Sequence, residues 1–186
     1  MKTFEKVIIP HYDEIRLNLL ECLNSQFDDT VETVQMINGV LESSPLLNKF
    51  FVDNDLHLSY AVAFIRLPGS MIPIHIDDGQ DGTHEVKFEL ALNLPLENTA
   101  GTYQNYYDIP VEKLYNFYDP MVKQNYRTYD LNPETHKQFI PISSIELLDP
   151  HLIRLDLPHN IINPTDKTRK VISIRFMPQP THLWDK

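Results

Sequence analysis

The first third of the chain carries apolar residues at the spacing of an amphipathic helix. One helical face would collect the side chains of Ile15, Leu19, Leu20 and Leu23. This pattern predicts a helix over residues 13–23, with Asp13 as its N-cap. A weaker pattern of the same kind predicts a second helix over residues 30–41, which ends before Pro45. We therefore expect residues 1–57 to form a helical support region.

From residue 58 onward the pattern changes to short segments that are rich in apolar and β-branched residues. Such segments predict strands at residues 59–67, 71–77, 84–96, 145–148, 152–157 and 168–177. Between them, glycine, proline and polar residues predict turns or loops at residues 68–70, 79–82 and 160–166. Many short strands after a helical start predict an antiparallel sandwich or barrel with helices outside, such as a jelly roll.

Residues 97–143 have poor periodicity and hold seven of the nine tyrosines. We expect an insertion here, with a hairpin around residues 102–107 and a helical turn near residues 111–117. The tyrosines favour packing against the core. Because long connections often carry function, Tyr126, Arg127 and Tyr129 are also candidates for a lid or a substrate contact.

The length of 186 residues fits one domain, with the jelly-roll core over residues 58–178. The only cysteine, Cys22, excludes an internal disulfide and a multi-cysteine metal cluster. No apolar run approaches the ~18 residues of a membrane span, so a cytoplasmic protein is predicted. The net charge of −10 disfavours a nucleic-acid partner, because an acidic surface repels phosphate.

The segment His75-Ile76-Asp77 is the first candidate for chemistry. In a strand, residues two apart point to the same side, so an imidazole and a carboxylate would enter one space. They supply two-thirds of the two-histidine, one-carboxylate triad that leaves open positions on iron. The similar run His11-Tyr12-Asp13 lies at a helix start, where positions two apart do not share a face.

A third ligand and a cation can come from later strands. His159 follows the strand over residues 152–157, and Arg169 lies ten residues further on. Alternation over residues 168–177 gives two faces, one with Arg169, Val171, Ser173 and Arg175, the other with Lys170, Ile172, Ile174 and Phe176. The apolar face can be the core with the arginines in solvent. Alternatively, Arg169 points inward, where it needs a carboxylate partner.

This order of His-x-Asp, a distant His and an Arg ten residues later resembles the iron(II)/2-oxoglutarate-dependent oxygenase superfamily. It is most similar to the small prolyl-hydroxylase-like and aspartyl-hydroxylase-like members. The resemblance implies a double-stranded β-helix, a cupin-like jelly roll, over residues 58–178. It implies that His75, Asp77 and His159 bind iron(II), and that Arg169 pairs with the far carboxylate of 2-oxoglutarate.

The same resemblance suggests further site residues. Ser173 can assist Arg169, although the common Arg-x-Ser spacing of the family is absent here. Asn93 and Tyr103 are candidate contacts of the co-substrate. Arg175 repeats an Arg-x5-Arg spacing that is seen in some nucleobase demethylases, which makes it a candidate substrate contact. The remaining candidates are expected at the surface: Asp78, His84, His151 and His182.

Three functions follow from these residues. The first is an oxygenase that hydroxylates a C–H bond of an amino acid, a peptide or a small molecule with oxygen and 2-oxoglutarate. The second is a cupin-type metal protein, which keeps the three ligands and does not need Arg169. The third is a non-enzymatic jelly roll in which the pair His75 and Asp77 is incidental.

Overall fold

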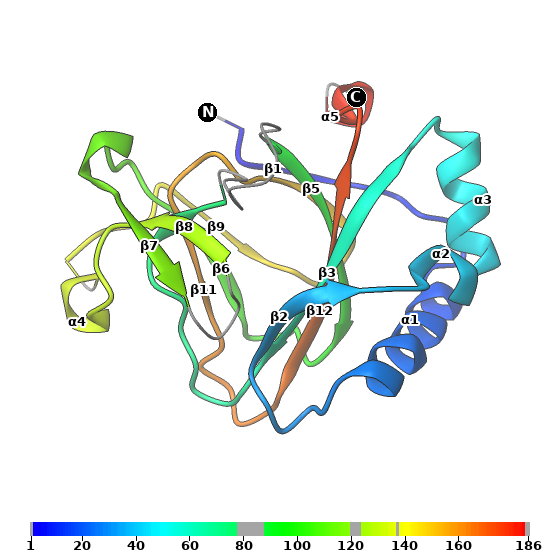
Figure 1. Ribbon diagram of the computed structural model, residues 1–186, viewed down its shortest axis with the longest axis horizontal. Helices are drawn as coiled ribbons and strands as arrows, with labels where there is room; N and C mark the ends of the chain where they lie inside the picture. Colours follow the sequence, from blue (N-terminus) through cyan, green and yellow to red (C-terminus); the bar gives the residue numbers. More distant parts are fainter. Residues whose placement is uncertain (1, 78–87, 120–123, 137, 185–186) are drawn as a thin grey trace.

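Two six-stranded antiparallel sheets face each other in the computed structural model, and helices cover the outer face of one of them (Figure 1). The structure describes residues 2–77, 88–119, 124–136 and 138–184. From residue 58 onward the chain crosses repeatedly from one sheet to the other. The mainly β, jelly-roll fold predicted from the sequence is therefore confirmed.

The first sheet contains the longest strands. Its strands lie in the order β1 (Phe4–Lys6), β10 (His151–Arg154), β5 (Leu90–Glu97), β12 (Arg169–Phe176), β3 (Leu58–Arg66) and β2 (Thr33–Ile37). The central strand β12 pairs with β3 on one side and with β5 on the other. All residues of β12 are buried, because one face packs on helices and the other faces the second sheet.

The second sheet is shorter and carries the His75 segment. Its strands lie in the order β7 (Tyr115–Asp119), β8 (Gln124–Thr128), β4 (His75–Ile76), β11 (His159–Ile162), β6 (Tyr103–Tyr106) and β9 (Ser143–Glu146). The strand predicted over residues 71–77 is reduced to β4, with an isolated bridge from Met71 to Ile162. The loop predicted at residues 79–82 lies outside the described residues.

Three helices near the N-terminus lie on the outer face of the first sheet (Figure 1). They are α1 (Tyr12–Gln26), α2 (Val40–Ser43) and α3 (Pro45–Asp53). Their buried side chains, such as Leu19 and Phe51, share one apolar cluster with Ile172 and Ile174 of β12. The other helical turns are η1 (Val111–Lys113), α4 (Pro133–His136) and α5 (Thr181–Trp184).

The N-terminal predictions need three corrections. α1 begins at Tyr12 after His11, whose backbone is left-handed (φ 59°), so Asp13 lies in the first turn and is not the N-cap. The helix predicted over residues 30–41 is wrong, because its centre forms the edge strand β2 on β3. Pro45 begins a helix instead of ending one, and the Ser44 hydroxyl caps α3 by accepting from the backbone N–H of Leu47.

The hairpin predicted around residues 102–107 is not formed. Instead, β6 is a single strand between β11 and β9. Near residues 111–117 the helical turn is limited to η1, and β7 follows it at once. The stretch 97–143 therefore supplies strands to the second sheet, and its tyrosines divide between buried positions, such as Tyr106, and exposed ones, such as Tyr118.

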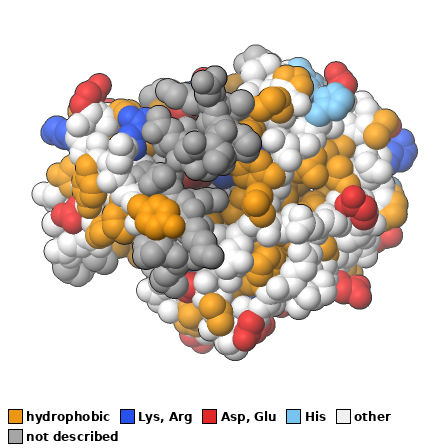
Figure 2. Space-filling model, viewed as in Figure 1, with side chains coloured by type: hydrophobic (Ala, Val, Ile, Leu, Met, Phe, Trp, Pro, Cys, Tyr) orange, Lys and Arg blue, Asp and Glu red, His pale blue; other side chains and the backbone are white. Residues whose placement is uncertain are grey.

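Figure 2 shows one face of the molecule, on which acidic side chains are widely spread. The Lys and Arg side chains visible there lie singly instead of gathering into a patch. Within the described part of the chain, no helix is long and apolar enough to cross a membrane.

Candidate active site

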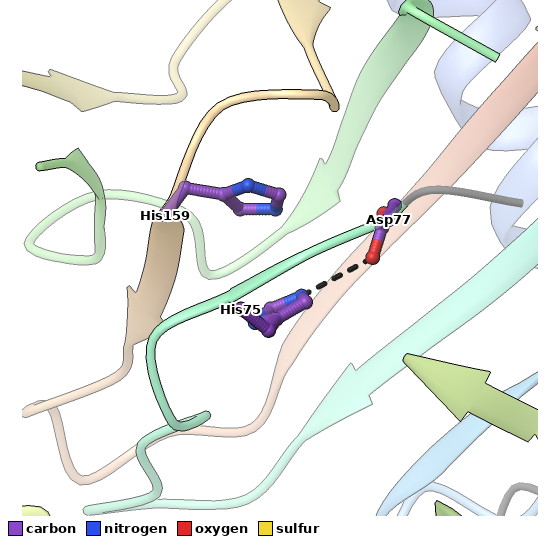
Figure 3. Close-up of side chains that lie close together, drawn as sticks. All are labelled: His75, Asp77 and His159. Carbon is purple, nitrogen blue, oxygen red and sulfur yellow. Dashed lines mark ion pairs between the residues drawn. The ribbon is translucent and has the colours of Figure 1, made fainter. Parts of the chain in front are cut away.

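Two neighbouring strands of the second sheet bring together the three candidate metal ligands. His75 in β4 stands directly opposite His159 in β11, so both side chains lie on the same face, and their ring centroids are 4.5 Å apart. Asp77 follows β4, and its Oδ1 lies 3.2 Å from Nε2 of His75 (Figure 3). One ligand atom from each residue lies within 4.8 Å of the others.

Both histidines are held in the same tautomer. Nδ1 of His75 lies 2.8 Å from the carbonyl oxygen of Pro73, and Nδ1 of His159 lies 2.8 Å from that of Leu157. A carbonyl only accepts, so each Nδ1 must donate its proton, and the Nε2 lone pairs are left for a metal. Each proton acceptor stands two residues before its histidine, so the local backbone fixes both rings.

Charge at the site also suits a cation. Burial alone would raise the pKa of Asp77, but the adjacent His75 side chain and the guanidinium of Arg175 hold it below its usual range. Burial lowers the pKa of His159 to about 4. The cluster therefore offers one carboxylate and a neutral His159 imidazole near pH 7. Two imidazole nitrogens and one carboxylate oxygen form a donor set that suits iron(II) with open positions.

A buried cation lies in the same pocket. Arg169 is 1% exposed, and its Nε donates to Oγ1 of Thr102 at 3.0 Å. Its Nη1 is buried and has no hydrogen-bond partner among the described residues. Burial, and then the charge of Arg66 on the neighbouring strand, lower the pKa of the guanidinium to about 9, which leaves it charged at neutral pH. An anion that enters the pocket would supply the missing partner.

The lining of the pocket between the sheets shows which face of β12 points inward, the question that the sequence left open. The pocket is lined by both arginines, by Ser173 and by the three candidate ligands. Its other walls are mostly apolar: Phe64, Ile153, Leu155, Ile161 and Val171. The arginine face of β12 therefore points into the pocket and not into solvent.

Ser173 and Arg175 belong to a polar wall of this pocket. Arg175 donates through Nη2 to Oδ2 of Asp77 at 3.1 Å and through Nη1 to the Ser173 hydroxyl. Ser173 in turn donates to Oδ1 of Asn93, which stands directly opposite it on β5. The wall continues through Gln104.

Sequence reasoning missed two residues of the pocket region and misplaced one. Tyr103, predicted as a co-substrate contact, is 41% exposed and does not line the pocket. Gln104, its neighbour in β6, lines the pocket instead, and Thr102 holds Arg169. Alternation along β6 would have found both, because residues two apart share a face.

The remaining candidates lie elsewhere. Arg127 in β8 stands opposite Ile76, which packs in an apolar cluster on the side of the sheet away from His75. The side chain of Tyr126, and all of Asp78 and His84, lie outside the described residues. His151 is buried beside the ring of Phe4, not at the surface as predicted. His182 is exposed, as predicted.

No family model matches the sequence, and no curated protein matches it. Solved structures do resemble the fold. One is the non-heme α-ketoglutarate-dependent carbocyclase SnoK from nogalamycin biosynthesis, at a TM-score of 0.56 and 10% identity, over 91% of this chain and 76% of that one. Another is the non-heme monooxygenase ThoJ in its apo form, at a TM-score of 0.54 and 14% identity, over 94% and 73%. These likenesses confirm the predicted jelly-roll fold, which this chain shares with SnoK and ThoJ.

Proposed function

We propose that this protein is an iron(II)- and 2-oxoglutarate-dependent oxygenase that hydroxylates a C–H bond of its substrate. One observation carries the proposal: a His-Asp-His cluster lines the same pocket as a buried arginine whose Nη1 has no partner within the described ranges of the chain. A metal-binding jelly roll without a carboxylate co-substrate would need the cluster and would not need the arginine.

His75, Asp77 and His159 would hold the iron. When bound, iron(II) supplies the oxidising chemistry that activates oxygen at the expense of 2-oxoglutarate. The chain supplies orientation: backbone carbonyls fix both imidazole rings before the metal arrives. The apolar walls, such as Leu155 and Ile161, would exclude water from the reacting atoms.

Arg169 would bind the carboxylate of 2-oxoglutarate that is remote from the metal. Thr102 occupies its Nε, so the guanidinium is oriented and Nη1 stays available to an incoming anion. Charge-assisted hydrogen bonds to a carboxylate would satisfy this buried charge.

For the substrate, we propose an amino acid, a peptide or a small molecule. The net charge of −10 supports this class over a nucleic acid, because an acidic surface repels phosphate.

The test is an anaerobic titration of the metal-free protein with iron(II) and then 2-oxoglutarate, followed by the visible charge-transfer band of the chelate. We expect a band in the parent and a requirement for at least about tenfold more 2-oxoglutarate in Arg169→Met, since a buried charge-assisted pair is lost. Arg16→Met is the matched control, because Arg16 bonds to the carbonyl of Leu96 at the outer helix layer.

Two results would contradict the proposal. Iron binding without a band in the parent would indicate a cupin-type metal protein. Absence of iron binding would indicate that the cluster of His75, Asp77 and His159 is incidental.

A further inference from the structure

Both oxygens of the Asp77 carboxylate have defined surroundings. Oδ2 accepts from Nη2 of Arg175 at 3.1 Å, whereas Oδ1 lies on the His75 side, 3.2 Å from Nε2. Figure 3 shows the carboxylate turned toward His75, opposite the ring of His159. Arg175 is 4% exposed, so water competes little for its guanidinium. One oxygen of Asp77 is thereby occupied by the protein, and the other is left for a metal.

Arg175 is itself held by a chain of hydrogen bonds that runs in one direction. Its Nη1 donates to the Ser173 hydroxyl, and the single hydroxyl proton of Ser173 is donated to Asn93. Farther along, Nε2 of Gln104 donates to the Tyr106 hydroxyl at 3.0 Å, and Tyr106 donates to the carbonyl of Arg154 at 3.2 Å. The chain ends on backbone, which does not rotate.

This direction decides what Ser173 can do. A hydroxyl has one proton, and that of Ser173 is directed at Asn93. It therefore has none for a carboxylate bound at Arg169, four residues away along the strand. The expectation from the sequence that Ser173 assists Arg169 with the co-substrate does not follow from these bonds.

We propose that Arg175 is a positioning residue that presents Asp77 to the metal through a single oxygen, and that Ser173 acts through Arg175 instead of binding the co-substrate. This inference rests on the proposed function, because it takes Asp77 to be a metal ligand. It assigns the two arginines of β12 to separate tasks, Arg169 to the co-substrate and Arg175 to the metal.

The experiment uses the full chain with Co(II) as the metal probe, because its visible spectrum reports the ligand geometry without oxidation. Affinities for Co(II), and for 2-oxoglutarate on the Co(II)-loaded protein, are measured by titration. The variants are Arg175→Met, Arg175→Lys, Ser173→Ala and Ser173→Thr, with Arg169→Met as the matched control. Circular dichroism verifies that each variant is folded.

We expect Arg175→Met to bind Co(II) about 10- to 100-fold more weakly, the usual effect of losing a hydrogen-bond partner of a metal ligand, with an altered Co(II) spectrum. Ser173→Ala should shift the Co(II) affinity in the same direction by a smaller factor, and Ser173→Thr should restore it. Arg169→Met should leave Co(II) affinity unchanged and weaken 2-oxoglutarate binding. If Arg175→Met does not fold, Ser173→Ala and Arg175→Lys carry the test.

Two outcomes would overturn the inference. One is a Co(II) affinity and spectrum in Arg175→Met equal to those of the parent. The other is a Ser173→Ala protein with unchanged Co(II) affinity and weakened 2-oxoglutarate binding, which would make Ser173 a co-substrate contact. Failure of the proposed function is distinct: the parent would then bind Co(II), with the expected Arg175 effect, and show no binding of 2-oxoglutarate.

Discussion

At the scale of single residues, the pocket depends on hydroxyl groups that hold arginine side chains. Thr102 is buried, accepts from Nε of Arg169 and donates to the carbonyl of Thr99 at 2.7 Å. Without this hydroxyl, the buried Nε of Arg169 would lose its hydrogen-bond partner. Because long side chains lose rotamer freedom when they bind, an arginine that is already fixed binds its anion more tightly.

We therefore predict that Thr102→Val weakens 2-oxoglutarate binding to the metal-loaded protein about tenfold, which corresponds to about 1.4 kcal/mol. The shape of the side chain is kept, so the loss reports the hydroxyl. Titration of the charge-transfer band measures the effect, and Thr102→Ser is the control that should bind like the parent. Equal affinities of the parent and Thr102→Val would show that Arg169 needs no support.

Sequence reasoning was strong for residues whose spacing maps directly onto geometry. The two-residue interval between His75 and Asp77 brings both side chains into one pocket, and His159 joins them from a second strand. The direction of the Arg169 side chain was ambiguous, because polar residues mark the solvent side of a strand only where one face of that strand is exposed. Both faces of β12 are buried, so its alternation of arginines and apolar residues could not identify the pocket side.

At the scale of elements, a buried lysine ties the first helix to the first sheet. Lys170 on β12 is 3% exposed, and its Nζ lies 2.9 Å from Glu97 and 3.2 Å from Asp29, which follows α1. It also donates to Asn24 in α1 at 3.0 Å. These contacts join three segments that are distant in the sequence.

Replacing this side chain by an uncharged one of similar length should loosen that junction. We predict that Lys170→Met lowers the free energy of unfolding by about 1–2 kcal/mol, less than for a fully buried pair because both carboxylates are partly exposed. Urea denaturation measures the change, and Lys167→Met, at an exposed position nearby, should stay within about 0.5 kcal/mol of the parent. A Lys170→Met protein as stable as its control would contradict this role.

The position of an element was predictable where its sequence fits only one periodicity. The periodicity of α1 is continuous. Of its four predicted inward residues, Ile15, Leu19 and Leu23 are buried and Leu20 is half-buried. Residues 30–41 were mistaken for a helix because Val34 and Ile37 also fit a helical interval. The free edge of β3 decided the outcome, since it offers a partner to a segment rich in β-branched residues. That partner is distant in sequence and invisible to local spacing.

At the scale of the whole molecule, the site joins the two sheets. The two candidate histidine ligands belong to the second sheet and Asp77 directly follows its strand β4, whereas Arg169 and Arg175 belong to β12 of the first sheet. The ion pair of Arg175 with Asp77 already links them. A co-substrate held by the metal at one end and by Arg169 at the other would add a second link, which forms only when both sheets are in place.

This arrangement predicts how ligands stabilise the fold. Because a ligand that binds only the folded protein adds RT ln(1 + [L]/Kd), 2-oxoglutarate at 100 times its Kd should add about 2.7 kcal/mol to the metal-loaded protein. For a chain of this size, that raises Tm by roughly 5–10 °C. Anaerobic thermal unfolding measures the increment in Tm from Mn(II) alone and the further increment from 2-oxoglutarate on the Mn(II)-loaded protein.

The variant Arg169→Met separates the stabilisation by Mn(II) from the stabilisation by 2-oxoglutarate. It should keep the increment from Mn(II), whose ligands all lie in or directly after strands of the second sheet, and lose most of the increment from 2-oxoglutarate at the same concentration. Succinate, which has two carboxylates and no keto group to chelate the metal, should stabilise the parent much less than 2-oxoglutarate. A 2-oxoglutarate increment that survives in Arg169→Met would mean that the far carboxylate binds elsewhere, and that the unpartnered Nη1 of Arg169 serves another anion.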